Sequence, residues 1–259
     1  MNNFEILCVT MNQEDFSKIE EMNINSNIIF ANQCNKTSYE EYEFKGKKGK
    51  MISTETRGVG VNRNISLMYA TADICLFADD DMYYYDDLEK KIITEFNSHP
   101  DADIIIFNVD SDSKERKQKR YTKTRKYKFF EKMPWGGVRI AFRLNSIKKA
   151  NIWFTTLFGG GCIFPSGEDS FWLLEAKRKG LIFYVSKEII GKVSFESSSW
   201  FKGQNESFFL GKGAFYAAAH PYTKYIWMLY FALRTKKEIS IVKKYKFMLL
   251  GSKKFKELN

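Results

Sequence analysis

The chain has 259 residues, of which 44% are hydrophobic and 16% aromatic, so it can build one large α/β core and is too apolar to be disordered. Its net charge of +10 is concentrated in residues 114–128 and 223–259, which carry +8 each and leave −6 for the rest. A mildly acidic body with two basic segments indicates contact with an anionic surface at defined places. It argues against a protein that binds nucleic acid through an evenly basic face.

The N-terminal residues, Met1 to Glu5, include no basic leader followed by an apolar stretch, so we expect no secretion signal. The longest apolar run, Tyr225 to Leu233, has nine residues, against roughly 18–20 needed to span a bilayer. We therefore expect a protein that stays inside the cell. Its four cysteines are far apart and form no C-x-x-C pair, which predicts buried, reduced thiols: Cys8, Cys34, Cys75 and Cys162.

The first half of the chain alternates between short apolar runs and amphipathic segments. In chain order it predicts strands over 4–10, 28–31, 51–54, 74–78 and 103–107, and helices over 14–22, 61–70 and 86–97. Continuous rather than alternating apolar strands are typical of a mostly parallel sheet covered on both faces. In the helix over 61–70, Val61, Ile65 and Met68 share one face.

Ligands of such sheets gather at the carboxyl ends of the strands. Polar residues follow several of the predicted strands and would line that one edge: Thr10, Asn12, Asn32, Gln33, Asp79, Asp80 and Asp81.

The second half begins with the basic segment 114–128, which reads as a loop or a hairpin. A strand over 139–143, a helix over 146–150, a helix over 170–179 ending at Gly180 and a strand over 181–185 follow. We expect a catalytic domain over 1–222 and a basic helical extension over 223–259.

In that extension the apolar residues recur at helical spacing among lysines: Ile241, Val242, Tyr245, Met248 and Leu249. Such a helix can lie in a membrane interface, or it can dock on the catalytic domain with a solvated lysine face. We favour the membrane.

The acidic triplet Asp79, Asp80 and Asp81 is the strongest chemical signal in the chain. Three adjacent carboxylates repel one another unless a cation is present, and Mg²⁺ or Mn²⁺ accepts such oxygen ligands while bridging to substrate phosphates. An acidic turn that caps the next helix is the alternative. The buried strand that runs directly into the triplet favours a metal and phosphate site.

Two further segments could carry chemistry. Arg63 follows Gly58 and Gly60, a combination that suits phosphate binding, although the arginine could instead pair with a neighbouring acid. Glu168 and Asp169 follow three glycines and open a helix. They are either ordinary helix-start acids or a general base for an acceptor hydroxyl, and we favour the base.

The two histidines are His99 and His220. A lone histidine is usually structural, so we favour a structural role for His220 over a role as a metal ligand. The aromatic residues of 200–203 and 208–209 either line an acceptor site or belong to the core.

Taken together and in order, GVGVNRN (58–64), LFADDD (76–81), GGGC (159–162) and GEDS (167–170) resemble the bacterial family-two glycosyltransferases of GT-A fold, over roughly residues 4–215. Members of this family build capsular, lipopolysaccharide and other surface glycans from nucleotide sugars.

The resemblance implies a role for each candidate residue. The nucleoside would be bordered by Thr10, Asn12, Asn32 and Gln33, and the phosphates by Arg63. The ribose or donor sugar would contact Asp79 and Asp80. Asp79 is also a candidate metal ligand. Asp81 would bind Mn²⁺ or Mg²⁺. Asp169 would be the base of an inverting transfer, and Glu168 would help to bind the acceptor. The family suggests a uridine nucleotide as donor and a lipid-linked glycan as acceptor, with the protein peripheral to the inner membrane face.

One departure from the family concerns the metal. Residues 192–196 lack the histidine that many GT-A enzymes place there, so Glu196 or His220 would substitute, or the metal would depend on Asp81, phosphates and water. Two other classes compete with this interpretation. A nucleotidyltransferase would carry a glycine-rich basic loop after the first strand, which residues 10–14 lack, and a nucleic-acid-binding protein is suggested by charge alone.

Overall fold

The computed structural model describes residues 2–111, 120–128, 131, 136–193, 203–235 and 239–258. The strands are β1 (Phe4–Met11), β2 (Asn27–Gln33), β3 (Ser38–Phe44), β4 (Lys47–Thr54), β5 (Ile74–Asp79), β6 (Met82–Tyr84), β7 (Ile104–Ser111), β8 (Arg125–Lys126), β9 (Ile140–Arg143) and β10 (Phe183–Val193). The helices are α1 (Lys18–Glu21), α2 (Val59–Tyr69), α3 (Leu88–Ser98), the 3₁₀ turn η1 (Gly137–Arg139), α4 (Leu144–Lys149), α5 (Glu168–Arg178), α6 (Glu206–Ala219), α7 (Lys224–Arg234) and α8 (Ile241–Glu257).

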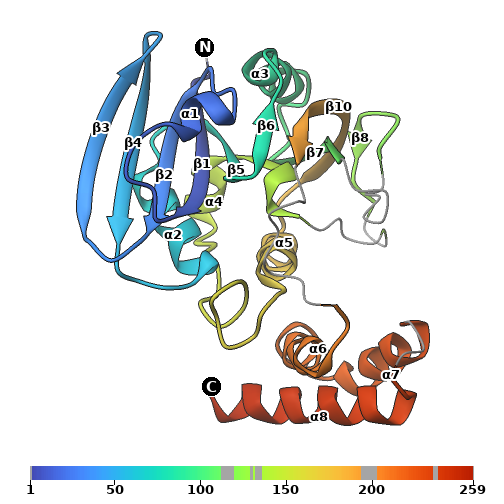
Figure 1. Cartoon of the computed structure of the whole chain (residues 1–259). Coiled ribbons are helices and arrows are strands. Elements are labelled where there is room, and N and C mark those ends of the chain that lie inside the picture. Colours follow the sequence, from blue (N-terminus) through green and yellow to red (C-terminus); the bar gives the residue numbers. More distant parts are fainter. Residues whose placement is uncertain are drawn as a thin grey trace.

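One mixed sheet forms the centre of the molecule, in the order β3-β4-β2-β1-β5-β9-β7-β10-β6 (Figure 1). Strands β4, β2, β1 and β5 are parallel neighbours, and β7 pairs in parallel with β10. Antiparallel β9 separates these two groups. The predicted GT-A-like α/β sheet flanked by helices is confirmed.

Alternate residues of the central strands enter two separate cores, which explains why these strands are apolar throughout. Ile6 and Leu76 pack on the side covered by α1 and α3, whereas Leu7 and Phe77 pack on the side of α2, α4 and α5. Three of the cysteines are buried and Cys162 is half-buried, and all four are free thiols, as predicted.

The sheet continues beyond the expected strands in a hairpin that the apolar pattern did not reveal. Strand β3 has the sequence SYEEYEF, is mostly exposed, and pairs antiparallel with β4. Lys45 and Gly46 connect the two strands with positive φ angles of 47° and 70°, as two-residue hairpin turns require. A solvated edge strand needs no continuous apolar run, so its charged sequence hid it.

Two helix predictions are corrected. The helix expected over 14–22 contracts to the four residues of α1. Helix α2 forms where expected but buries Asn62, Arg63, Ser66 and Leu67, while Met68 is 65% exposed. Polar side chains therefore face the protein interior here, which the apolar pattern could not predict.

The C-terminal part is a group of three helices below the sheet layers (Figure 1). Phe209 of α6, Met228 and Ala232 of α7, and Met248 of α8 share one small core. Helix α6, which the expected boundary at residue 222 assigns to the catalytic domain, thus packs with α7 and α8. Of the apolar residues predicted to share a side of α8, Met248 is buried in this core and Tyr245 packs against it, whereas Ile241, Val242 and Leu249 stay exposed.

Helices α6 and α8 approach each other unusually closely at two glycines. A Cβ added to Gly213 would overlap the carbonyl oxygen of Met248, and one added to Gly251 would overlap that of Leu210. The two backbones are therefore in direct contact.

Gly251→Ala should lower the melting temperature, because the new methyl group must push two helix backbones apart. Overpacking typically costs about 1–3 kcal/mol, and in a chain of this size each kcal/mol corresponds to about 2–4 °C. Thermal unfolding followed by circular dichroism measures the shift, with Lys253→Ala on the exposed side of α8 as control. An unchanged melting temperature for Gly251→Ala would contradict the close packing.

Candidate active site

The carboxyl ends of the parallel strands meet at one edge, as expected. Thr10 of β1 pairs in register with Asn32 of β2, and Val9 pairs with Asp79 of β5. The hydroxyl Oγ1 of Thr10 donates a hydrogen bond of 2.5 Å to Oδ2 of Asp80. The structure thus brings the first strand and the acidic triplet together.

Asn32 and Gln33 direct their amides into the protein. Asn32 Oδ1 accepts from Gln13 N (3.0 Å), and its Nδ2 donates to Gln13 O (2.8 Å) and Ser53 Oγ (3.0 Å). Gln33 Oε1 accepts from Gly58 N at 2.7 Å. These amides fix the loop after β1 and the start of α2. Asn32 and Gln33 would therefore contribute to nucleoside binding by shaping this edge of the sheet, because their amide groups already bond to the protein. Asn12 is exposed at the same edge, with a φ of 53°.

Arg63 is the centre of the site. Its side chain is 2% exposed, and Nη2 lies 3.0 Å from Oδ1 of Asp79. Its Nη1 forms an ion pair with Oδ1 of Asp169, 106 positions further along the chain. The guanidinium also lies 5.2 Å from the ring centroid of Phe154. One buried arginine therefore joins the acidic triplet to the candidate base.

Asp169 is held at both carboxylate oxygens. Arg63 occupies Oδ1, and the backbone N–H of Gly137 donates to Oδ2 at 2.7 Å. A Cβ on Gly137 would lie within 2.8 Å of three guanidinium atoms of Arg63, so that position requires glycine. The sequence pointed to neither contact, although the pair Gly136-Gly137 was a signal that could have drawn attention to it.

The glycine motifs pack against each other. A Cβ on Gly60 would overlap the carbonyl oxygen of Thr155, and one on Gly159 would overlap Val59 and lie 3.1 Å from Cδ of Glu168. We expected Gly58 and Gly60 to let the backbone approach a ligand. In the structure they let it approach residues 155–162 of the protein. Through Gly159 the same contact positions Glu168 at the start of α5.

Asp81 differs from its two neighbours because its Oδ1 is buried without a hydrogen-bond partner among the described residues. Burial, followed by the charges of Asp79 and Asp80, raises the pKa of Asp81 from 3.8 to about 7. No cationic group therefore compensates the negative charge of Asp81 among the described residues. An oxygen ligand in that state fits a hard divalent cation, so Asp81 is the residue that would hold Mn²⁺ or Mg²⁺.

The protein side chains alone do not complete a metal site. In the described ranges, no group of three or more His, Cys, Asp and Glu side chains is arranged to hold a metal ion. His220 follows the last residue of α6 and stacks on Trp227 at 5.1 Å. Helix α6 lies below the sheet, apart from β5 and β6 (Figure 1). The proposed role of His220 as a metal ligand is therefore not supported. Glu196 and the aromatic residues at 200–202 lie outside the described residues.

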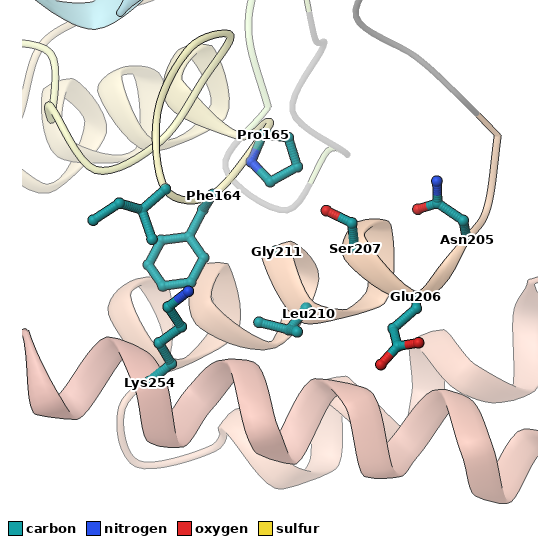
Figure 2. Close-up of a pocket in the computed structure, with 9 residues that line it drawn as sticks. Phe164, Pro165, Asn205, Glu206, Ser207, Leu210, Gly211 and Lys254 are labelled. Carbon is teal, nitrogen blue, oxygen red and sulfur yellow. The ribbon is translucent and has the colours of Figure 1, made fainter.

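A cleft of about 480 Å³ lies between the loop 163–165 and helices α6 and α8 (Figure 2). Pro165 and Leu210 give it apolar walls, and Glu206, Ser207 and Lys254 give it polar groups. The residues that line it do not include Asp169 or the acidic triplet. Asp169 follows Pro165 by only four residues, so the cleft lies within about 14 Å of the candidate base by chain length alone. Phe209, expected in an acceptor site or the core, is fully buried in the helical core.

Comparisons with known proteins agree with this geometry. Residues 24–158, more than half of the chain, match the family described as Glycosyl transferase family 2. A comparison with curated proteins gives no match.

Among solved structures, TarS of S. aureus is similar in fold. Its fragment 1–349 in complex with UDP-GlcNAc has a TM-score of 0.60 and 14% identity, with 95% of this chain and 70% of that chain covered. The same fragment in complex with UDP has a TM-score of 0.59 and 15% identity, covering 91% and 76%. A longer TarS structure has a TM-score of 0.61 and 15% identity over 91% of this chain, which spans only 46% of that TarS chain.

Asp81→Asn should stabilise the protein in the absence of metal. Because the folded state raises the pKa of Asp81 to about 7, the folded protein binds a proton that the unfolded chain releases, and stability falls as pH rises from about 4 to 7. The gain in melting temperature should therefore be large near pH 8 and small near pH 4.5. Thermal unfolding at both pH values measures the gain in melting temperature. An equal gain at both pH values would contradict a buried carboxylate whose negative charge is not compensated.

Arg63→Gln should lower the turnover number by roughly 100-fold, since Asp169 loses the group that fixes its orientation. Initial rates of nucleoside diphosphate release measure this. The matched control is Arg178→Gln, which removes an arginine at the last residue of α5 that pairs with Glu175. A wild-type turnover number for Arg63→Gln would show that the arginine is not needed to position Asp169.

Proposed function

The chain belongs to glycosyl transferase family 2, and we propose that it is a metal-dependent, inverting enzyme that moves a sugar from a UDP-linked donor to a hydroxyl of a glycan acceptor. One observation carries this proposal: Arg63 holds Asp169 beside the acidic triplet at the carboxyl edge of the sheet. A donor-side cluster and a base are thus joined in one site.

The donor side is the edge formed by β1, β2 and β5. The TarS structures in complex with UDP-GlcNAc and UDP, which share the fold, support a uridine nucleotide there. Asp79 and Asp80 are already held by Arg63 and Thr10. Asp81 remains for Mn²⁺ or Mg²⁺, which when bound would supply positive charge to the departing diphosphate.

Asp169 is suited to the role of base. Its side chain is 17% exposed, and each carboxylate oxygen keeps a further lone pair after its contact with Arg63 or Gly137. In the proposed step the acceptor hydroxyl gives its proton to Asp169 while its oxygen bonds to C1 of the sugar. The bond between C1 and the diphosphate oxygen breaks, with inversion at C1. Glu168, next to Asp169, would bind the acceptor.

The acceptor is proposed to be a lipid-linked intermediate of a surface or capsular polysaccharide, used at the inner face of the cell membrane. The basic segment 223–259, with a net charge of +8, supports an anionic membrane as partner. No helix in the described ranges has the length and apolar content needed to cross a bilayer. The cleft beside the loop 163–165 is the proposed place for the acceptor, because this loop leads within four residues to Asp169.

Asp169→Asn should reduce transfer by roughly 10²–10⁴-fold while leaving the dissociation constant for the donor unchanged, because asparagine keeps an oxygen that can accept from Arg63 but cannot take the proton of the acceptor hydroxyl. The donor is found first by incubating the full chain with Mn²⁺ and a panel of nucleotide sugars and measuring release of nucleoside diphosphate.

Glu175→Gln serves as the matched control, because it removes a carboxylate of the same helix that pairs with Arg178 at the surface. If no nucleotide sugar is bound or cleaved, the proposed function fails. If Asp169→Asn keeps wild-type turnover, the enzyme has a different base.

A further inference from the structure

Among the described residues, helix α7 presents an apolar surface that no other element covers. Its inward residues Met228 and Ala232 are buried, whereas the opposite side exposes large apolar side chains at helical spacing. We call this the α7 face, and its members and exposed fractions are Tyr222 (97%), Ile226 (70%), Leu229 (48%), Tyr230 (48%) and Leu233 (59%).

One charge borders the α7 face at its C-terminal end, where the exposed Arg234 donates to the hydroxyl of Tyr230 at 2.5 Å. Between residues 222 and 233 the sequence has a single charged residue, Lys224, and its side chain is 4% exposed. Isolated exposed apolar residues are ordinary on protein surfaces, but a contiguous uncharged patch marks a contact site. Trp227 lies beside it at 40% exposure, and Trp and Tyr are the side chains favoured where apolar and aqueous phases meet.

Positive charge surrounds this apolar surface. The described residues from 203 to 258 include nine Lys and Arg but only Glu206 and Glu257 as acids. On α8, Lys246 and Lys253 are exposed on the same outward side as Val242 and Leu249. An apolar stripe beside exposed lysines is the pattern of helices that lie in an anionic membrane interface.

Helices α7 and α8 form one surface because both ends of α7 reach α8. Lys244 Nζ donates to Thr235 O at 3.2 Å, and the ammonium groups of Lys224 and Lys256 lie close together. Burial, followed by that neighbouring ammonium, lowers the pKa of Lys224. Of this pair only Lys256 is exposed, so it is the cation that an anionic head group can approach.

We infer that the α7 face inserts into the interface of an anionic phospholipid membrane, with the lysines of α8 at the level of the head groups. A second copy of this chain fits less well, because its own lysines would meet those of α8. The inserting surface therefore differs from the expected one: α8 uses Met248 to dock on the protein, and α7 supplies the uncharged apolar side.

The three-helix group that carries the α7 face also contacts the segment before the candidate base. Phe215 of α6 packs against Phe158 and the backbone of Gly167, which directly precedes Glu168 and Asp169. The cleft of Figure 2 lies between that loop and α6 and α8.

Flotation of the full chain with vesicles tests the inference. Wild-type protein should float with phosphatidylcholine vesicles that contain about 30 mol% phosphatidylglycerol, and far less with phosphatidylcholine alone. The double variant Ile226→Gln and Leu233→Gln should bind roughly tenfold or more weakly, since each side chain loses apolar contact with lipid. Met68→Gln, at a position 65% exposed on α2, is the matched control and should float like wild type.

Three results would overturn the inference. These are no flotation with anionic vesicles, flotation of the double variant at the wild-type level, and a dimer in light scattering that the double variant dissociates. Circular dichroism of each variant verifies that it is folded, and both substituted side chains are mostly exposed. The inference rests on the proposed membrane location, but flotation requires no transfer reaction, so its failure would leave the proposed chemistry standing.

Discussion

The ion pairs of Arg63 are the contacts on which the rest of the candidate site depends. A guanidinium that is 2% exposed must be balanced, and here Asp79 and Asp169 balance it from two distant parts of the chain. The position of this guanidinium constrains two neighbouring parts of the chain. A side chain at Gly137 would collide with it, and α2 turns a polar side toward the protein interior. The acidic edge of the sheet and the start of α5 are consequently fixed relative to each other by protein contacts alone.

The three aspartates of the triplet consequently have different environments. Asp79 is paired with Arg63, and Asp80 accepts from Thr10, whereas Asp81 has a buried oxygen without a partner among the described residues. A site whose protein ligands include one such carboxylate would bind a cation mainly together with the phosphates of the nucleotide. That arrangement agrees with the missing histidine in residues 192–196 and with the position of His220 beside Trp227.

The sequence was sufficient for features that depend on local patterns. Continuous apolar runs predicted β1, β2, β5 and β7, and the acids placed directly after β5 and at the start of α5 predicted the two halves of the site. Contacts between distant residues were beyond it. Nothing near Gly137 in the chain reveals that its N–H meets Asp169, and nothing near Met248 shows that it faces Phe209 rather than lipid. The hairpin of β3 was hidden for the opposite reason, since an exposed edge strand can be highly charged.

The crystal structure of the full chain with UDP and Mn²⁺ tests the central claim most directly. The account predicts the diphosphate at the carboxyl ends of β1 and β5, a metal ion bound by an oxygen of Asp81, and Arg63 still joined to Asp169. A nucleotide bound elsewhere, or a metal ion held without Asp81, would contradict it.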